Sequence, residues 1–422
     1  MRRQLEGSRA VAEAVARCRP EVVCAYPISP QTHIIEAIGA MVRTGAIERC
    51  EFVNVESEFA AMSVSIGASA AGARAYTATA SQGLLYMAEA VYNAAGLGLP
   101  IVMTLANRAL GAPINIWNDH SDAMSVRDSG WIQLFAEDNQ EAVDLHIQAF
   151  RLAEELSLPV MVCMDGFILT HAMEEVDLPS QAQVDDFLPP YSPRQVLDPA
   201  DPLSIGAMVG PEAYTEVRYL AHLRQLDALE AIPRIGTEFA AAFGRDSGGL
   251  VHPYRTEGAD TVLVAMGSVL GTIKDVVDDQ RDVGIPVGVV GITAFRPFPF
   301  AAVRAACQGA ERIVVVEKAF SLGFGGVLSS DVTMAGAAPH HLVHSVIAGL
   351  GGRPITKAAI ASLIERARRG EVGSLSFLDL DEDLIAGELA RMAAERRSGP
   401  VAENLLRDLA SAPHRSRETG RA

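Results

Sequence analysis

The chain has 422 residues, of which 49% are apolar and 21% are charged, and its formal net charge at pH 7 is −17. This composition predicts a substantial buried core and excludes a disordered chain, and the acidic charge argues against a nucleic-acid-binding surface. The sequence has no apolar run of about 18 residues and no apolar segment at its amino terminus, so we expect a cytoplasmic protein without a membrane span.

The five cysteines are scattered and none belongs to a Cys-x-x-Cys pair: Cys18, Cys24, Cys50, Cys163 and Cys307. The sequence therefore indicates neither a disulfide framework nor an iron–sulfur cluster. No His, Cys and Asp residues have the spacing of metal ligands either, so we expect no metal on this chain. If electrons move in this system, another chain must carry them.

Residues 1–175 alternate short β-type runs with helical periods, which is typical of a doubly wound parallel sheet in the α/β class. The predicted strands are Glu21–Ala25, Glu51–Val55, Ala75–Thr79, Pro100–Ala106 and Pro159–Cys163. The predicted helices are Ser8–Arg17, Gln31–Val42, Glu56–Ala71, Leu84–Ala94 and Asn139–Glu155.

Residues 176–255 are expected to form a linker with crossing helices. Prolines recur between Pro179 and Pro202, which predicts an irregular crossing without a helix, and a helix is expected at Pro211–Leu229. Residues 256–370 read as a second α/β domain, with these elements: strands Thr261–Met266, Val287–Val290 and Arg312–Val316, and helices Val269–Gln280 and Phe300–Cys307. We expect residues 371–422 to form a tail that is helical from about Asp379 to Arg397 and poorly ordered after it.

The stretch Tyr26-Pro27-Ile28-Ser29-Pro30 follows the first predicted strand and precedes a helix. Prolines keep the residues before them extended, and Ser29 stands where an N-cap belongs, with Pro30 at the first helical position. The sequence thus predicts an exposed hydroxyl at the carboxyl end of a strand, where open α/β sheets bind ligands. The alternative is an ordinary capped turn that binds nothing.

Glu58 lies at the start of a predicted helix of small residues, two positions after Glu56, so at least one of these carboxylates should face the carboxyl edge of the sheet. Complementarity to the helix dipole is the simpler explanation for an acidic residue there. Ser81-Gln82-Gly83 follows the next strand, and such a small polar turn lets backbone N–H groups approach a ligand. The spacing is neither that of a P-loop nor that of a dinucleotide fingerprint.

Arg108 follows the strand Pro100–Ala106 almost directly. A guanidinium at the carboxyl end of a strand suits bidentate binding of a carboxylate, although arginines are also common on surfaces. The nearby Asp119-His120-Ser121-Asp122 resembles a triad or a metal site, but adjacent residues on one element do not converge on one point. We expect a loop leading into a helix, with Ser121 or Asp122 as its cap.

Several of these stretches stand in one order: Tyr26–Pro30, Glu56–Glu58, Thr79–Leu85, Asn107–Leu110 and Asp119–Asp122. In this order they resemble the alpha chain of 2-oxoacid:ferredoxin oxidoreductases, of which pyruvate:ferredoxin oxidoreductase is the commonest member. The resemblance continues through further motifs and covers about residues 1–370: Asp165–Phe167, Gly210–Glu212, Met266–Ser268, Arg296–Phe298 and Glu317-Lys318.

The resemblance implies a thiamine diphosphate enzyme that is split over several chains. This chain would supply the pyrimidine-binding domain and a domain similar to the carboxy-terminal domain of transketolases. Glu58 matches the glutamate that hydrogen-bonds the aminopyrimidine ring and thereby favours the imino tautomer, which takes the proton from the thiazolium carbon. The cofactor supplies the chemistry and the protein orients it.

The same resemblance assigns the other candidate residues. Ser29 matches a position usually occupied by threonine, whose hydroxyl meets the substrate, and Arg108 matches the arginine that holds the 2-oxoacid carboxylate. The residues expected to line the cofactor pocket beside Glu58 are Tyr26, Pro27, Ile28, Ser81 and Gln82. For Glu317 and Lys318, the motif suggests no role beyond pairing at a domain interface.

The Gly-Asp-Gly motif that holds magnesium and diphosphate in thiamine enzymes is absent from the sequence. The resemblance therefore places Mg²⁺ and the diphosphate on a beta subunit, and [4Fe-4S] clusters on gamma and delta subunits. The expected reaction converts a 2-oxoacid to an acyl-coenzyme A, with coenzyme A as co-substrate. Electrons would pass to ferredoxin, or to NAD through a flavin subunit.

Three departures from the family pattern concern the substrate: Ser29 for threonine, Asn107 before the arginine, and a short loop Gly111–Asn118 that carries Trp117. They leave room for an acid bulkier than pyruvate, such as a branched-chain acid or phenylglyoxylate. Two alternatives stay open, namely the beta chain of a lipoyl-linked 2-oxoacid dehydrogenase and a non-catalytic scaffold subunit.

Overall fold

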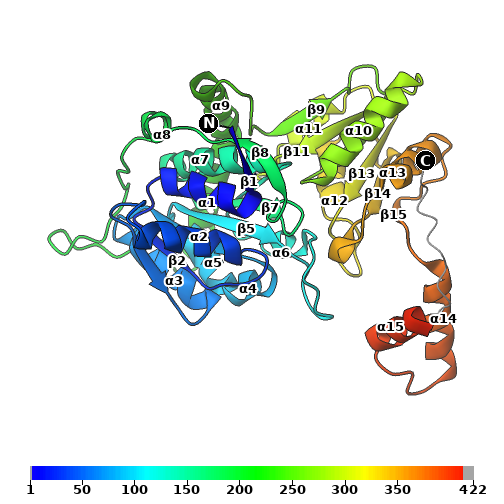
Figure 1. Cartoon of the computed structure of the whole chain (residues 1–422), viewed down its shortest axis with the longest axis horizontal. Helices are drawn as coiled ribbons and strands as arrows, with labels where there is room; N and C mark the ends of the chain where they lie inside the picture. The colour runs from blue at the N-terminus through cyan, green and yellow to red at the C-terminus, as the bar shows by residue number, and fades with distance from the viewer. Residues whose placement is uncertain (1, 412–422) are drawn as a thin grey trace. The chain divides into compact units, whose positions relative to one another are not determined.

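A computed structural model describes residues 2–411, which form two compact units, with the division in the chain between Ser376 and Phe377. The first unit contains two large sheets and a short two-stranded one (Figure 1). No helix within residues 2–411 is long and apolar enough to cross a membrane.

The first large sheet has seven strands in the order β12-β6-β7-β5-β4-β2-β3. Their bounds are β2 (Val22–Ala25), β3 (Glu51–Asn54), β4 (Ala75–Thr79), β5 (Ile101–Asn107), β6 (Ile132–Phe135), β7 (Val160–Asp165) and β12 (Ala294–Arg296). All pairs are parallel except β12 with β6. Strands β4 to β7 are buried along their whole length, as expected for a parallel sheet that is covered on both faces. The doubly wound parallel sheet is thus confirmed.

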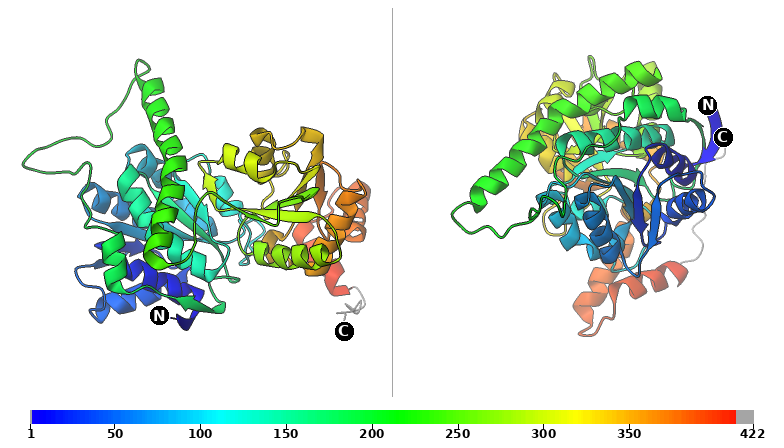
Figure 2. Two further views of the ribbon diagram at one scale, coloured as in Figure 1. Left: turned by 90° about the horizontal axis from the view of Figure 1, so that it is seen from above. Right: turned by 90° about the vertical axis from the view of Figure 1, so that its left-hand side faces the viewer.

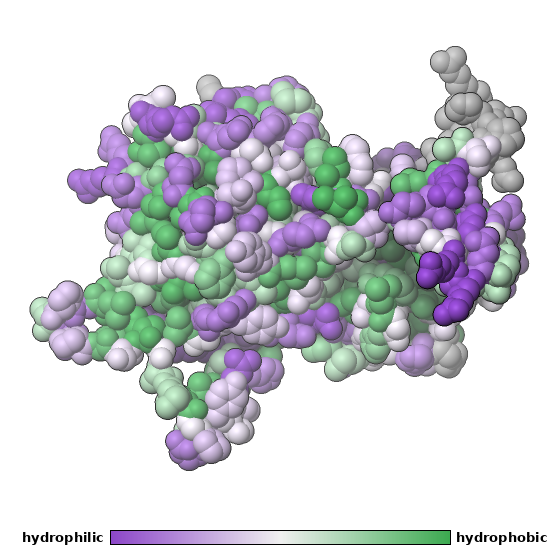
Figure 3. All heavy atoms as spheres, turned by 90° about the horizontal axis from the view of Figure 1, so that it is seen from below, coloured by the Kyte–Doolittle hydropathy of each residue, from purple (hydrophilic) through white to green (hydrophobic). Residues whose placement is uncertain are grey.

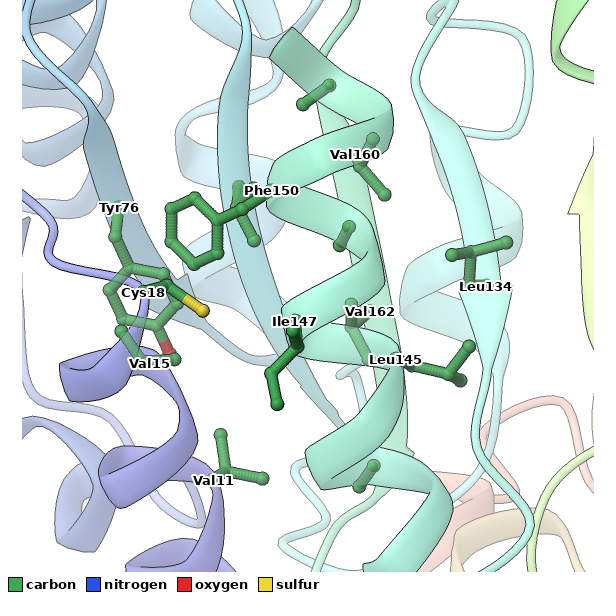
Figure 4. Close-up of a cluster of buried hydrophobic side chains, with 14 of the residues drawn as sticks. Val11, Val15, Cys18, Tyr76, Leu134, Leu145, Ile147, Phe150, Val160 and Val162 are labelled. Atoms are coloured by element: carbon green, nitrogen blue, oxygen red, sulfur yellow. The ribbon is translucent and has the colours of Figure 1, made fainter. Parts of the chain in front are cut away.

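Helices cover both faces of this sheet. They are α1 (Gly7–Arg17), α2 (Thr32–Arg43), α3 (Glu58–Ala70), α4 (Ser81–Tyr86), α5 (Ala88–Gly96), α6 (Ser121–Ser125), α7 (Asn139–Leu156), α8 (Gln181–Phe187) and α9 (Tyr214–Phe243). Helix α7 packs between α1 and α9, and α3 packs on the other side against α5. Figure 4 shows part of the first helical layer, with Tyr76 and Phe150 between α1 and α7. The amino-terminal part of α9 extends beyond α7 (Figure 2).

The second large sheet has the order β15-β14-β13-β10-β11-β9. Its strands are β9 (Val251–Tyr254), β10 (Thr261–Ala265), β11 (Val287–Ile292), β13 (Arg312–Glu317), β14 (Val343–Ile347) and β15 (Leu375–Phe377). Its helices are α10 (Val269–Asp282), α11 (Phe300–Ala306), α12 (Leu328–Ala335) and α13 (Lys357–Arg368), with the 3₁₀ turns His340–Leu342 and Leu350–Gly352. The segment after β11 returns to the first sheet as β12, so the two sheets share a continuous apolar core.

A buried carboxylate joins the two sheets. Asp165, the last residue of β7, accepts hydrogen bonds from Lys318 Nζ (2.8 Å) and from the backbone N–H of Ser268 (3.0 Å), which follow strands β13 and β10 of the second sheet. His120 Nε2 lies 2.8 Å from its other oxygen. Burial alone would raise the pKa of Asp165, but Lys318 and His120 hold it well below its usual range. Gly267 (φ +74°) is required here, because a Cβ would lie 3.1 Å from His120 Nε2.

The structure corrects several sequence-based expectations. The helix expected at Leu84–Ala94 is two helices, α4 and α5, and the proline-rich crossing contains α8, which Ser180 starts with a capping box. The small sheet of β1 (Arg2–Glu6) and β8 (Met173–Asp177) was not predicted, because Arg2–Glu6 has no alternation of apolar residues. The domain limits within residues 1–376 remain a prediction.

The second unit contains two helices, α14 (Glu382–Ala394) and α15 (Val401–Ser411). Arg391 pairs with Asp408 at 2.7 Å, and Asn404 donates to Glu388 at 3.0 Å, so polar contacts join the two helices. The expected disorder after Arg397 is therefore wrong for α15. Residues 412–422 lie outside the described part of the chain.

A buried histidine makes the stability of the first domain depend on pH. Tyr76 Oη lies 2.6 Å from Thr104 Oγ1, which lies 2.5 Å from His146 Nε2, while Nδ1 of the same ring lies 2.6 Å from the Ala142 carbonyl. The neutral imidazole satisfies this chain of contacts, and burial lowers the pKa of His146 to about 4.

We therefore expect the free energy of unfolding to fall between about pH 6.5 and pH 4. In this window the unfolded chain binds a proton at His146 that the folded chain does not, which costs stability on the order of 3 kcal/mol. Urea unfolding at several pH values measures it, and His146→Gln should flatten the curve. The exposed His222→Gln is the control; equal pH dependence in both variants would contradict the assignment.

Candidate active site

The candidate site lies at the carboxyl edge of the first sheet, where the chain reverses its strand order. From β2 the chain adds β3 on one side and then β4 on the other, so the crevice between the ends of β2 and β4 is the topological switch point. Ligands of open α/β sheets bind in such a crevice. Ser29 follows β2, Glu58 begins the helix after β3, and Ser81 follows β4.

Glu58 is the first residue of α3 and is only 7% exposed, while Glu56 is exposed. Ser57 caps the helix by accepting from the Ala60 N–H at 3.2 Å. Within residues 2–411, the Glu58 carboxylate forms no hydrogen bond and no ion pair. The Glu58 oxygens are not among the fully buried side-chain atoms that lack a partner, so they stay accessible to solvent or to a ligand.

Gly83 and Thr79 lie beside this carboxylate. A Cβ on Gly83 would lie 2.8 Å from Glu58 Oε1 and 2.5 Å from Thr79 Oγ1, so only glycine fits at this position. Thr79 Oγ1 is itself buried and has no hydrogen-bond partner among the described residues. An unpaired carboxylate and an unpaired buried hydroxyl therefore lie next to the same glycine, which leaves no room for a larger side chain there.

The turn after β2 differs from the expectation at its helix start. The N-cap of α2 is Gln31 rather than Ser29, and the Ser29–Pro30 peptide bond is cis. Gln31 is fully buried and donates to the carbonyls of Tyr26 (2.8 Å) and Ala78 (3.3 Å), which ties the turn to β4. The capping role proposed for Ser29 is wrong, but its exposed position at the carboxyl edge is confirmed.

The rest of the turn follows from this anchoring. Tyr26 and Pro27 are exposed, and Ile28 is half-buried with its carbonyl accepting from the Gln31 N–H at 2.9 Å. The turn thus presents Tyr26, Pro27 and Ser29 toward any ligand or partner at this edge.

Ser81 and Gln82 begin α4. Ser81 is fully buried, and its Oγ donates to the Ala109 carbonyl at 2.6 Å, so the end of β4 is fixed to the segment after β5. Gln82 is half-buried, and its Nε2 lies close to Gly111, where a Cβ would be 2.5 Å away. Ser81 is thus structural, and Gln82 faces the loop after β5.

Arg108 is 7% exposed and lies just after β5. Its Nη1 donates to the Ser29 carbonyl at 3.0 Å and its Nε to the Asn115 carbonyl at 2.9 Å. Nη2 makes no hydrogen bond within residues 2–411, so one donor arm is free. The structure brings Ser29 and Arg108 together, but no hydrogen bond in the described chain links either of them to Glu58.

Asp122 has a structural role that the Asp119–Asp122 motif did not predict. Neither Ser121 nor Asp122 is the cap of α6: His120 is the N-cap residue, and Asp119 Oδ1 accepts from the Ser121 N–H (3.0 Å). Asp122 is completely buried and accepts from the N–H groups of Ser81 (3.0 Å) and Arg108 (2.9 Å) through one oxygen.

The other Asp122 oxygen accepts from Asn107 Nδ2 (2.9 Å) and from the Ala123 N–H (2.8 Å). Burial raises the pKa of Asp122 to about 7, although these donors oppose the shift. One carboxylate therefore fixes the ends of β4 and β5 and the start of α6. Its only signal in the sequence was the Asp119–Asp122 motif.

Exposed apolar side chains follow the site residues along the chain. They are Tyr26, Phe59, Leu85, Tyr86, Ile114, Ile116 and Trp117. The face drawn in Figure 3 carries patches of hydrophobic residues between hydrophilic ones. Clustered exposed apolar residues mark surfaces that another molecule covers.

Two family models match the chain. Residues 13–234 match the thiamine diphosphate-binding domain of pyruvate flavodoxin/ferredoxin oxidoreductase, and residues 259–360 match core domain II of pyruvate:ferredoxin oxidoreductase. The first match contains every candidate site residue described above.

Similar proteins include pyruvate synthase subunit PorA of Methanosarcina barkeri, which is 47% identical over 90% of this chain and 97% of that protein. Ketoisovalerate oxidoreductase subunit VorA of Pyrococcus abyssi is 39% identical over 87% of this chain and 94% of that protein.

Among solved structures, 2-oxoglutarate:ferredoxin oxidoreductase of Magnetococcus marinus is similar with a TM-score of 0.69 and 19% identity, covering 87% of this chain and 65% of that one. A split-gene transketolase beta tetramer follows with a TM-score of 0.51 and 14% identity, covering 86% of this chain and 98% of that one. At these identities the likeness concerns the fold alone.

Replacing Asp122 should destabilise the chain. Asp122→Asn puts an NH₂ group where an oxygen now accepts two hydrogen bonds, and buried donors left without a partner cost about 1–3 kcal/mol. Urea unfolding of the full chain measures the loss, with the exposed Asp128→Asn as control. Equal stability of the two variants would show that Asp122 does not fix this edge.

Proposed function

The chain belongs to the pyruvate flavodoxin/ferredoxin oxidoreductase family as an alpha subunit of a 2-oxoacid:ferredoxin oxidoreductase, and we propose that Glu58 holds the aminopyrimidine ring of thiamine diphosphate. One observation carries the proposal: a nearly buried carboxylate at the switch point has no partner in the described chain. A ring nitrogen that shares a proton with Glu58 would supply the missing hydrogen-bond partner. Gly83, where no larger side chain fits, and the unpaired Thr79 hydroxyl lie next to this carboxylate.

When bound, thiamine diphosphate supplies the chemistry that decarboxylates a 2-oxoacid. Glu58 would share a proton with the ring nitrogen opposite the amino group and so select the imino tautomer. The rigid cap of α3 and the close contact with Gly83 keep the carboxylate in one place, which preorganises this hydrogen bond. Tyr26, Pro27, Ile28 and Gln82 would form the wall of the pocket, and the buried Ser81 would support this wall by holding the end of β4 in place.

Arg108 and Ser29 are the proposed substrate-binding residues. The free Nη2 arm of Arg108 suits the carboxylate of a 2-oxoacid, because a guanidinium donates in a fixed plane. The Nη1 bond to the Ser29 carbonyl (3.0 Å) sets the distance between this charge and the Ser29 hydroxyl. The substrate would be held by its carboxylate at one end and oriented by the hydroxyl at the other.

Pyruvate or a bulkier acid such as phenylglyoxylate would fit this arrangement. The similar proteins act on pyruvate in some cases and, by their names, on ketoisovalerate in others. Serine at residue 29 is smaller by one methyl group than the usual threonine, which enlarges the substrate end of the pocket.

The site needs a second chain. We propose that a beta subunit binds Mg²⁺ and the diphosphate, that gamma and delta subunits carry [4Fe-4S] clusters, and that coenzyme A accepts the acyl group. Ferredoxin or an NAD-linked flavin subunit would receive the electrons. The exposed apolar residues beside the site, including Phe59, Tyr86 and Trp117, support a partner that lies on this edge.

Membership of this family excludes the alternative that the chain is the beta chain of a lipoyl-linked dehydrogenase. Substitution of Glu58 distinguishes a catalytic subunit from a non-catalytic scaffold. Glu58→Gln should lower kcat of the assembled complex by about 100-fold or more, because Gln cannot hold the proton. Dye reduction with saturating 2-oxoacid measures kcat, and the exposed Glu56→Gln is a matched control. An intact complex of the Glu58 variant with normal turnover would favour the scaffold.

Arg108→Ala should chiefly raise KM for the 2-oxoacid. Loss of a charged hydrogen bond of about 1.5–3 kcal/mol corresponds to a KM about 10 to 150 times higher. Steady-state kinetics of the assembled complex over a substrate series measures it, with the exposed Arg43→Ala as control. An unchanged KM would remove Arg108 from the substrate site.

A further inference from the structure

A second constellation of ligand-type side chains lies at the same edge of the first sheet, outside the site described above. Glu6, His33 and His171 each offer one metal-ligand atom, and these atoms all lie within 4.8 Å of one another. Glu6 ends β1, His33 lies in the first turn of α2, and His171 lies between β7 and β8. Since they come from three distant parts of the sequence, no spacing motif reveals them.

The backbone fixes two of these segments against each other. Strand β1 pairs with β8 in a register that places Glu6 opposite Met173. Past the end of the ladder, the Gly7 N–H donates to the Ala172 carbonyl (3.0 Å) and the Ser8 N–H to the Thr170 carbonyl (2.9 Å). Backbone hydrogen bonds thus join the residues next to Glu6 to the residues on both sides of His171. The main chain therefore fixes the position of Glu6 relative to His171.

The side chains are oriented as well. Thr170 Oγ1 accepts from the Phe167 N–H at 2.8 Å and lies 2.7 Å from His171 Nδ1. With Nδ1 donating to Thr170, Nε2 of His171 carries the free lone pair, which is how outer contacts orient metal-binding histidines. The His33 ring lies with its centroid 4.8 Å from that of His171, and its Nδ1 is 2.6 Å from Glu6 Oε1.

The distances are close to those of a metal site. Ligand atoms about 2.0–2.1 Å from a tetrahedral zinc ion are roughly 3.4 Å apart. The ligand atoms of the three side chains are now up to 4.8 Å apart. Small side-chain rotations that move each atom by about an ångström would bring them to the separation found around zinc. Glu6 and His171 are half-buried and His33 is exposed, so an ion can reach them without opening the fold.

We propose that Glu6, His33 and His171 bind a divalent transition metal ion of the zinc class. Two imidazoles and one carboxylate are the ligands that Zn²⁺, Co²⁺ and Ni²⁺ accept, whereas Mg²⁺ and Ca²⁺ prefer oxygen alone. Three protein ligands leave at least one position for water. A simple ion pair would need only one of the two histidines.

Metal binding would join three chain segments near the proposed substrate site. The His171 ring contacts Phe167 (centroids 4.8 Å apart), and Phe167 contacts Trp117 (5.0 Å) in the loop whose Asn115 carbonyl accepts from Arg108. The ion would therefore be expected to stabilise the first domain rather than to take part in the reaction.

The test uses the full chain without a polyhistidine tag, stripped of metal with a chelator and titrated with Co²⁺. We expect one equivalent to produce the visible absorption of a bound Co²⁺ ion, and one equivalent of Zn²⁺ to abolish it. His33→Ala and His171→Ala should each weaken Co²⁺ binding at least 10-fold. The exposed His222→Ala on α9 should bind like the unchanged chain.

A folded chain that gives no absorption with Co²⁺, or a His33→Ala/His171→Ala double variant that binds as tightly as the unchanged chain, would overturn the proposal. Circular dichroism establishes that each variant is folded. If an alanine variant does not fold, Glu6→Gln and His171→Gln replace it, because both keep the side-chain volume and weaken the ligand. Zn²⁺ should also raise the Tm of the unchanged chain and leave the Tm of the double variant unaltered.

Discussion

The candidate active site depends on the buried carboxylate of Asp122. Both of its oxygens accept two hydrogen bonds, and the donors belong to the ends of β4 and β5 and to the start of α6. The backbone at residues 81 and 108 therefore cannot move independently. Asp122 accepts from the Arg108 N–H, and Arg108 Nη1 donates to the Ser29 carbonyl. Through these two hydrogen bonds, the position of Asp122 also influences the position of the turn after β2.

Much of this fold follows from local sequence patterns. The buried strands β4, β5 and β7 are runs rich in apolar residues, with few polar ones among them, and their expected bounds differ from the observed ones by two residues at most. Parallel strands that are covered on both faces leave such runs, so the pattern is strong. The strand Arg2–Glu6 is different, because pairing with residues about 170 positions away, rather than its own composition, makes it a strand.

The site could be predicted in part. Positions after strands pointed to Ser29, Glu58, Ser81 and Arg108, because the carboxyl ends of parallel strands lie at one edge. The N-cap assignment of Ser29 is wrong, because the rule uses only neighbouring residues, whereas the turn before α2 is held by Gln31 through hydrogen bonds to the Tyr26 and Ala78 carbonyls. Asp122 was taken for a helix cap for the same reason: its partners at residues 81 and 107 are distant in sequence.

The ion cluster around Asp165 has a consequence for recombination between relatives. The carboxylate comes from the first sheet, whereas Ser268 and Lys318 follow strands β10 and β13 of the second sheet. Asp165 and Lys318 are buried and Ser268 is half-buried, so water contributes little to the balance of these charges. Consider a chimera whose second sheet comes from another family member. The charge of Asp165 is compensated in it only if the new segment also has a lysine at residue 318 and a hydrogen-bond donor at residue 268. Chimeras that combine the first sheet of one protein with the second sheet of another should therefore take Asp165, Ser268 and Lys318 from the same protein.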